Sequence, residues 1–227
     1  SVGAAYAELI RLDSMNYDNL IGYINFLSEQ HQYPVAINLA EKALTFIKTP
    51  EKRYELWSWL STLYSLTSRW QQSENAMIET IVIARKLAGQ NPEVFLPYLA
   101  ESLRRLGDWY DDKEQRSHAK KAYTEAVEIY RNLAQQNPKV HMFSLADALA
   151  DIGNYYALNE QIQEAENAFR ESERICRNLA EQEPSIDAWI YLEQTLRKLG
   201  DFYSQNDHPE KAQKVYSEIE AICHTIT

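Results

Sequence analysis

Polar side chains that could bind a partner recur at a regular interval along the chain. One series is acidic, and its members stand 46 residues apart: Glu55, Glu101 and Asp147. A second series follows at intervals of 46 and 47 residues: Asp108, Asn154 and Asp201. Carboxylates arranged on one surface can hold basic groups through charge-assisted hydrogen bonds. The fixed interval indicates that copies of one structural unit position these side chains, so their chemistry depends on that unit.

The residue types that usually carry catalysis or bind metals show no such arrangement. None of the five histidines has an H-x3-H partner, and the two cysteines do not form a C-x2-C pair. The glycine motifs of nucleotide and phosphate sites are absent, as is the G-x-S-x-G motif of hydrolases. We therefore expect no enzymatic activity, no catalytic residues, no metal site and no cofactor.

Charge and hydropathy exclude further classes. The chain of 227 residues has a formal net charge of −10 and a pI near 5.1, whereas nucleic-acid binders present a basic patch. No apolar run approaches the ~18 residues that span a bilayer. No basic segment followed by an apolar one opens the chain, as a secretion signal would. We expect a cytoplasmic protein with no nucleic-acid or membrane partner.

The unit behind the regular spacing is visible in three similar segments. Residues 91–110 read NPEVFLPYLAESLRRLGDWY, residues 137–156 read NPKVHMFSLADALADIGNYY, and residues 183–203 read EPSIDAWIYLEQTLRKLGDFY. Their prolines are 46 residues apart, and one residue is inserted after the third. A period of this size is typical of stacked-repeat proteins, in which each unit buries its apolar face only against its neighbours.

Within a unit the pattern is Leu-Gly-x-x-Tyr, a polar loop, and then Ala-x3-aromatic, as in Gly107, Ala119 and Tyr123. This pattern resembles the tetratricopeptide repeat, a helix–turn–helix unit. The resemblance implies an all-α, right-handed superhelical solenoid of about five antiparallel helix pairs. The predicted units are approximately 14–49, 50–90, 91–136, 137–182 and 183–227, preceded by an N-terminal helix within 1–13.

The units are longer than the 34 residues of the common tetratricopeptide repeat. The intervals between the repeated prolines, glycines and alanines place the extra residues in the helices, by one to two turns each. Long units with LA-x2-NP at the joint, as at residues 133–138, look like those of bacterial repeat proteins. Such arrays are often attached to an ATPase or protease module.

In this family the first helix of each unit lines the concave side of the superhelix. The polar stripe on that face gives the candidate binding residues: Glu55, Glu101, Arg104, Asp108, Asp147, Asn154, Arg197 and Asp201. We expect a groove that binds a peptide with basic residues along its acidic side chains. The two arginines could hold an acidic side chain or a terminal carboxylate. The alternative is an ordinary solvated face, with Glu101 and Arg104 forming a weak pair within one helix.

Two functions are compatible with this pattern. The first is a non-catalytic scaffold that binds a peptide or protein segment in the concave groove. The alternative is a regulatory or sensor domain of a larger multidomain enzyme, an ATPase or protease, acting through intramolecular contacts. The last helix carries Val215, Ile219, Ile222 and Ile226 with no following helix to cover them, which favours dimerisation or docking of a neighbouring domain there.

The two cysteines occupy equivalent positions in consecutive units, because Cys176 and Cys223 each follow a repeat alanine by 11 residues. Equivalent positions on stacked helices lie roughly 8–10 Å apart, and a disulfide requires Cα atoms within about 7 Å. We expect two buried thiols in a reducing compartment.

Overall fold

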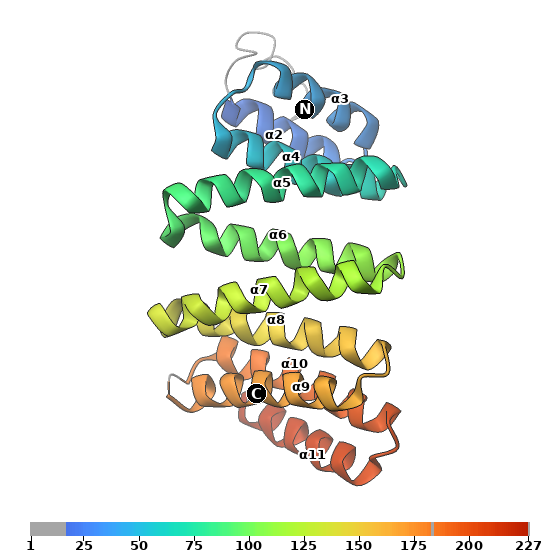
Figure 1. The fold of residues 1–227 in the computed structure, drawn as a ribbon. Helices are drawn as coiled ribbons and strands as arrows, with labels where there is room; N and C mark the ends of the chain where they lie inside the picture. Colours follow the sequence, from blue (N-terminus) through green and yellow to red (C-terminus); the bar gives the residue numbers. More distant parts are fainter. Residues whose placement is uncertain (1–16, 183, 227) are drawn as a thin grey trace. The chain divides into compact units, whose positions relative to one another are not determined.

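The computed structural model describes residues 17–182 and 184–226, and every regular element within them is an α-helix (Figure 1). The helices follow in the order α2 (Tyr17–Glu29), α3 (Tyr33–Phe46), α4 (Pro50–Leu66), α5 (Trp70–Gln90), α6 (Pro92–Asp112), α7 (Arg116–Gln136), α8 (Pro138–Leu158), α9 (Ile162–Gln182), α10 (Ile186–Gln205) and α11 (Pro209–Ile226). The predicted all-α fold of about five helix pairs is confirmed. The N-terminal helix expected within residues 1–13 lies outside the described residues.

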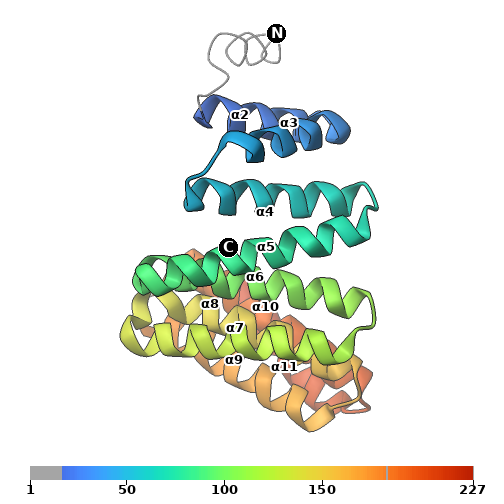
Figure 2. The same cartoon turned by 45° about the horizontal axis from the view of Figure 1, so that its top comes forward.

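The chain forms two compact units, one up to Phe95 and one from Leu96 onward. In the first, α4 and α5 run antiparallel, as both views show (Figures 1 and 2). Its core contains leucines and isoleucines of α2 and α4, including Ile24, Leu27 and Leu60, together with alanines of α3. The second unit contains α7 to α11 and most of α6, and it carries most of the candidate site.

The extra length of the repeat is helix, as the sequence predicts. Helices α6, α7, α8 and α9 each have 21 residues. A single residue, Asn137, separates α7 from α8, and Pro138 follows as the first helical residue, where a missing N–H costs nothing. The Asn137 side chain makes no capping hydrogen bond. The connection between α9 and α10 is longer and includes Pro184 and Ser185, and there the Ser185 side chain does accept from the Ala188 N–H at 3.1 Å.

The turn inside each helix pair has one conformation throughout the described chain. A residue with φ of 55–59° closes each first helix, and none of these residues is glycine: His31, Ser68, Glu114, Glu160 and Asp207. The next N–H reaches back five residues, as from Gln115 to the Tyr110 carbonyl at 2.8 Å. This is the hydrogen bond of a Schellman motif, which satisfies a carbonyl at the helix end. The recurring turn sets how each pair folds back on itself.

Each repeat glycine lies directly under an aromatic ring of the partner helix. A Cβ at Gly107 would stand 2.7 Å from the Tyr123 ring, and one at Gly200 would stand 2.7 Å from the Tyr216 ring. At Gly153 the Phe169 ring is 3.1 Å from the same position. Because real Cβ atoms do not approach other atoms so closely, the glycines allow the two helices of a pair to cross at short distance.

The two cysteines are not joined in a disulfide, as expected. Cys176 is buried, with its Sγ 3.4 Å from the Thr195 hydroxyl oxygen, and burial raises the pKa of its thiol. Cys223 is exposed, so the prediction that both cysteines are buried is wrong for it. The packing differs because Cys223 lies on α11, the last helix of the described residues, and stays exposed there.

Most of the apolar stripe on α11 is covered within the chain. Ile219 and Ile222 are 7% and 6% exposed, and Val215 is half-buried. The Ile226 side chain lies outside the described residues. The stripe therefore packs largely within the second unit, where α10 and α11 are in contact. This removes much of the exposed apolar surface on which the expectation of end-to-end dimerisation depended.

Candidate functional site

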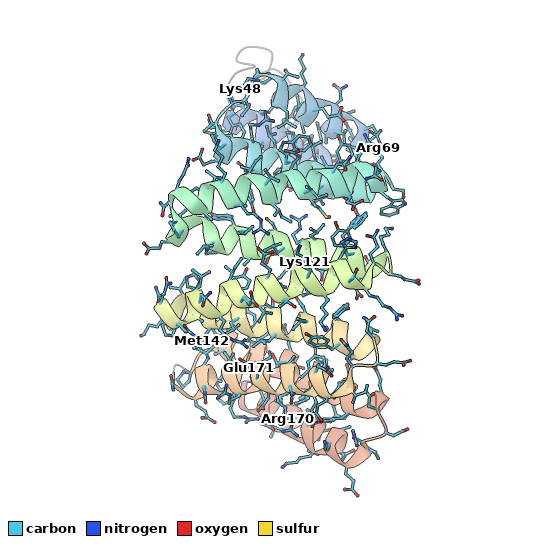
Figure 3. The ribbon with its side chains drawn as sticks, viewed as in Figure 1. Lys48, Arg69, Lys121, Met142, Arg170 and Glu171 are labelled. Carbon is cyan, nitrogen blue, oxygen red and sulfur yellow. The ribbon has the colours of Figure 1, made fainter. Side chains whose placement is uncertain are left out.

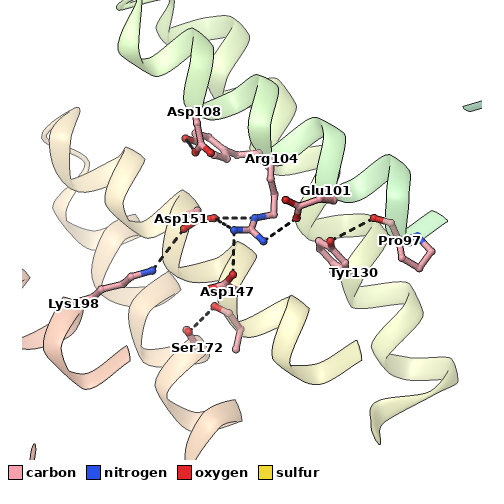
Figure 4. A network of polar contacts seen from close by, with 11 residues as sticks. Pro97, Glu101, Arg104, Asp108, Tyr130, Asp147, Asp151, Ser172 and Lys198 are labelled. Carbon is pink, nitrogen blue, oxygen red and sulfur yellow. Dashed lines mark hydrogen bonds and ion pairs between the residues drawn. The ribbon is translucent and has the colours of Figure 1, made fainter. Parts of the chain in front are cut away.

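Charged side chains connect the first helices of three successive pairs, α6, α8 and α10 (Figure 4). Arg104 extends from α6 and contacts two aspartates on α8, and Lys198 of α10 approaches one of them. Helices α8 and α10 also contact each other directly. We call this set of side chains the charge ladder: Glu101, Arg104, Asp147, Asp151 and Lys198.

Arg104 is the centre of the charge ladder. Its Nε and Nη2 lie 2.9 and 2.5 Å from Oδ2 of Asp151, and Nη2 lies 3.1 Å from Asp147. Nη1 pairs with Glu101 at 3.1 Å. The Arg104 side chain is only 17% exposed. Burial opposes its positive charge, but the three carboxylates outweigh that effect and raise its pKa. The guanidinium therefore stays charged and joins α6 to α8.

Two members of the charge ladder, Asp151 and Lys198, are absent from the stripe predicted by sequence. Lys198 Nζ lies 3.7 Å from Oδ1 of Asp151. Asp151 follows Asp147 by one helical turn, so the i, i+4 relation placed it on the same face. Position 150, which stands where Arg104 stands in the preceding unit, is a buried alanine. A search for acidic residues around that small residue could have found Asp151.

In the predicted series Asp108, Asn154 and Asp201, the residue type at each position matches the aromatic residue on the second helix of the same pair. The Tyr123 hydroxyl donates to Asp108 at 2.6 Å, and the Tyr216 hydroxyl donates to Asp201 at 2.7 Å. In the middle pair the aromatic residue is Phe169, which has no hydroxyl, and the matching residue is Asn154. Aspartate therefore stands where the ring can donate a hydrogen bond, and the neutral amide stands where it cannot.

A polar recess of about 270 Å³ opens between the C-terminal halves of α6 and α8. We call it the acidic recess; its lining residues are Asp108, Asp111, Asp112, Tyr123, Asp151, Asn154 and Tyr155. Burial raises the pKa of Asp108, and the nearby Asp151 adds to the rise while Tyr123 opposes it. Burial also raises the pKa of Asp111, with a further contribution from Asp112. A cation placed among these carboxylates would favour their charged forms.

The remaining predicted residues, Arg197 and Glu55, have partners in their own helix or in their own compact unit. Arg197 forms an ion pair with Glu193 one turn earlier in α10 and is 59% exposed. Glu55 belongs to the first compact unit, where it accepts a hydrogen bond from the Tyr17 hydroxyl at 2.6 Å. The structure thus brings together Glu101, Arg104 and Asp147 in the charge ladder, and Asp108 and Asn154 in the acidic recess.

Charged and polar side chains form the charge ladder and line the acidic recess. Within residues 17–182 and 184–226, no three His, Cys, Asp or Glu side chains converge in a way that could hold a metal ion. The same part of the chain contains no helix with the length and apolar character needed to cross a membrane. A side-chain ammonium or guanidinium has the charge and the hydrogen-bond donors that the acidic recess can satisfy.

Comparison with known proteins supports the repeat assignment. The family model of the tetratricopeptide repeat matches residues 100–133, which cover the second half of α6 and most of α7. No sequence among curated proteins matches the chain. The resemblance to the tetratricopeptide repeat is confirmed by this match and by the solved structures with the same fold.

Several solved structures share the fold over nearly the whole chain. BtubC from P. vanneervenii superposes with a TM-score of 0.75 at 16% identity, covering 99% of this chain and 87% of that one. YrrB, a tetratricopeptide repeat protein with an unusual peptide-binding site, has a TM-score of 0.53 at 16% identity, covering 96% and 92%. The third structure is a signal transduction ATPase with numerous domains from Pyrococcus horikoshii, which has a tetratricopeptide repeat sensor. It superposes with a TM-score of 0.70 at 17% identity, covering 97% of this chain and 31% of that one. At these identities the likeness establishes the fold.

Proposed function

Because the chain carries a tetratricopeptide repeat and has the fold of such proteins, we propose that it is a non-catalytic scaffold that binds a peptide or protein segment. The binding surface is the face formed by α6, α8 and α10. The partner contributes at least one lysine or arginine, which enters the acidic recess. Repeat proteins of this kind use surfaces that extend over several units to bind extended partners, which supports the choice of this face.

The acidic recess is the observation that carries this proposal. Four of its lining residues are aspartates, and burial disfavours the charged form of two of them. A partner cation placed among these carboxylates would form ion pairs that are less screened than pairs on an open surface. The exposed amide of Asn154 at the same recess can accept from or donate to the partner backbone.

The charge ladder has a different part in this proposal. Glu101 and Asp147 are already paired with Arg104, so they offer less negative charge to a partner than their positions in the sequence indicate. Arg104 itself is surrounded by three carboxylates and has little capacity left for an acidic ligand. We therefore propose that the ladder holds α6 and α8 at the spacing that keeps the recess open, and that the recess makes the contact.

The test is a selection of random peptides displayed on phage against the full chain, followed by fluorescence anisotropy with the enriched peptides. We expect lysine- or arginine-containing peptides that bind the double variant Asp111→Asn, Asp112→Asn at least about tenfold more weakly. The control is Glu128→Gln, Glu164→Gln, which removes two exposed carboxylates from α7 and α9 and changes the net charge equally. Basic peptides that bind the recess variant and the control with equal affinity would exclude the recess as their site.

A second candidate function is a sensor or regulatory domain of a larger enzyme, acting through intramolecular contacts. The specific support is the ATPase from Pyrococcus horikoshii, because this chain matches 31% of that longer protein, which has a tetratricopeptide repeat sensor. The nucleotide sequence on either side of the coding segment, read in the same frame, decides between the two. An adjoining ATPase or protease domain would favour the sensor function.

Three further features belong to the proposal. We place the protein in the cytoplasm of a bacterium, supported by its sparse use of cysteine and its buried Cys176 thiol. The five-unit division with boundaries near residues 49, 90, 136 and 182 is supported by the helix pairs. Dimerisation or domain docking through α11 is tested by size-exclusion chromatography with light scattering, in which a strict monomer would exclude self-association.

A further inference from the structure

A second concave feature lies away from the acidic recess, between the N-terminal end of α8 and the C-terminal end of α9. It is a cleft of about 520 Å³, and its walls include Pro138, Lys139, Met142, Arg174, Ile175 and Leu179. Figure 3 labels Met142 on the α8 side of this region. The exposed surface of the cleft is mainly apolar. We call it the α8/α9 cleft.

Comparison between units shows where the exposed apolar surface comes from. Leu179 is half-buried, whereas Leu133 and Leu87, 46 and 92 residues earlier, are 3% and 1% exposed. The connection after α7 is the single residue Asn137, whereas both Pro184 and Ser185 precede the start of α10 at Ile186. The longer connection starts α10 two residues later than the repeat would, at the same end of α9 as Leu179. The cleft is thus a local departure from the repeat.

The charges at the α8/α9 cleft are opposite to those of the acidic recess. Lys139 and Arg174 line it, and no carboxylate does so among the described residues. A cleft lined, among the described residues, by cationic side chains and by no carboxylate contrasts with the formal net charge of −10 of the whole chain. Arg174 is exposed, so its guanidinium can reach a ligand at the cleft mouth. The walls therefore combine an apolar floor from Met142, Ile175 and Leu179 with cationic side chains.

We propose that the α8/α9 cleft is a second docking site, which takes one bulky apolar side chain of a partner segment that is flanked by aspartate or glutamate. The apolar side chain enters between Met142 and Leu179, and the flanking carboxylates pair with Arg174 and Lys139. This goes beyond the binding of basic residues at the recess, because it selects a segment of opposite charge. The cleft and the recess lie on α8 at opposite ends, around Met142 and Asn154, so both can be occupied at once.

The experiment uses the full chain and the same phage-displayed random peptides, with affinities measured by fluorescence anisotropy. Enriched peptides are expected to include a class with a leucine, methionine or phenylalanine beside aspartate or glutamate. Leu179→Trp fills the cleft, and Arg174→Glu reverses its charge; each should weaken this class at least about tenfold. Lys121→Glu, an equal charge reversal on the exposed face of α7 (Figure 3), is the matched control and should change affinity less than about twofold.

Each outcome decides the proposal. If Leu179→Trp does not fold by circular dichroism, Asn178→Trp blocks the cleft from an exposed position of α9 and replaces it. Acidic, apolar peptides that bind the blocked variants as tightly as the parent would overturn the inference, as would a selection in which no such class appears. The two sites are told apart because the recess variant Asp111→Asn, Asp112→Asn should leave this class unaffected.

Discussion

The Tyr123 hydroxyl donates a hydrogen bond of 2.6 Å to Asp108, while the ring of the same tyrosine lies on Gly107. One side chain of α7 thus both packs on the closest point of α6 and holds a carboxylate at the edge of the acidic recess. Tyr216 repeats the arrangement with Gly200 and Asp201. Packing inside the helix pair and polar chemistry at its face are therefore linked through one residue.

Loss of the Tyr123 hydroxyl should affect stability and charge together. In Tyr123→Phe the ring still covers Gly107, but Asp108 loses a donor, which should cost about 1 kcal/mol in the free energy of unfolding. Because that hydrogen bond opposes the rise in the Asp108 pKa, the pKa should rise further. A folded-state pKa above the unfolded value gives stability that is present at low pH and lost as pH rises through the folded pKa. Urea denaturation and NMR titration of Asp108 measure both effects; an unchanged Asp108 pKa would contradict the prediction.

A methyl group at a crossing glycine should push the paired helices apart. Gly107→Ala places a Cβ 2.7 Å from the Tyr123 ring, and we expect a loss of about 1–3 kcal/mol in the free energy of unfolding. The control is Gly89→Ala in α5, where nothing lies within 4 Å of the added atom. That variant should be neutral or more stable by up to about 1 kcal/mol, because alanine favours helix. Urea denaturation compares the two; equal changes would contradict the close-approach argument.

Arg104 and Arg197 occupy equivalent positions in two repeats, but their surroundings differ. Arg104→Met leaves Glu101, Asp147 and Asp151 without their shared cation, and we expect a loss of about 2–3 kcal/mol in stability. Arg197→Met breaks an exposed pair with Glu193 and should change stability far less than Arg104→Met does. Denaturation midpoints of both variants in low and high salt check this. Similar losses for the two would show that the charge ladder contributes no more than a surface pair.

Glu166 should provide a pH-dependent part of stability. Although burial acts in the other direction, hydrogen bonds from Lys211, Tyr203 and Arg170 lower its pKa to about 2. A lowered folded-state pKa means stability that is present above the unfolded value, near 4.5, and lost as pH falls toward about 2. Glu166→Gln should therefore cost about 1.5 kcal/mol at neutral pH.

The cost of Glu166→Gln should shrink steadily as the pH falls below about 4.5. Glu164→Gln, at an exposed position of the same helix, is the control and should stay within about 0.5 kcal/mol of the parent throughout. Thermal unfolding followed by circular dichroism across this pH range gives the comparison. A Glu166→Gln cost that is constant with pH would show that the carboxylate is not stabilised by its three donors.

The repeated Pro, Gly and aromatic positions predicted the helix pairs because each has a strict geometric requirement. Pro138 begins a helix directly after its neighbour ends, and Gly107 admits a ring that no other residue would. Such requirements are local to one pair and therefore visible in the order of residues along the chain. The length of the helices followed from the same intervals.

The polar site was only partly predictable from the sequence, because contacts between neighbouring repeats depend on the length of the side chains. Spacing along one helix placed Glu101, Arg104 and Asp147 on the right face, but the length of the Arg104 side chain decided that it binds Asp151 as well. Spacing also gave no sign that Glu101 and Asp147 would be paired with Arg104, or that Asp111 and Asp112 would line a recess with Asp108. Cys223 was misjudged for a similar reason, since its exposure depends on contacts with other helices, which the spacing of the repeat does not reveal.

The connection that contains Pro184 and Ser185 departs from the single-residue joints before α6 and α8. Because each unit contacts mainly its neighbours, a longer joint disturbs a single interface and leaves the other helix pairs intact. Here the longer joint coincides with an apolar cleft beside Leu179, while α8 and α9 keep the 21 residues of α6 and α7. A change of length at one joint can therefore alter the surface beside that joint while the preceding helices keep their form.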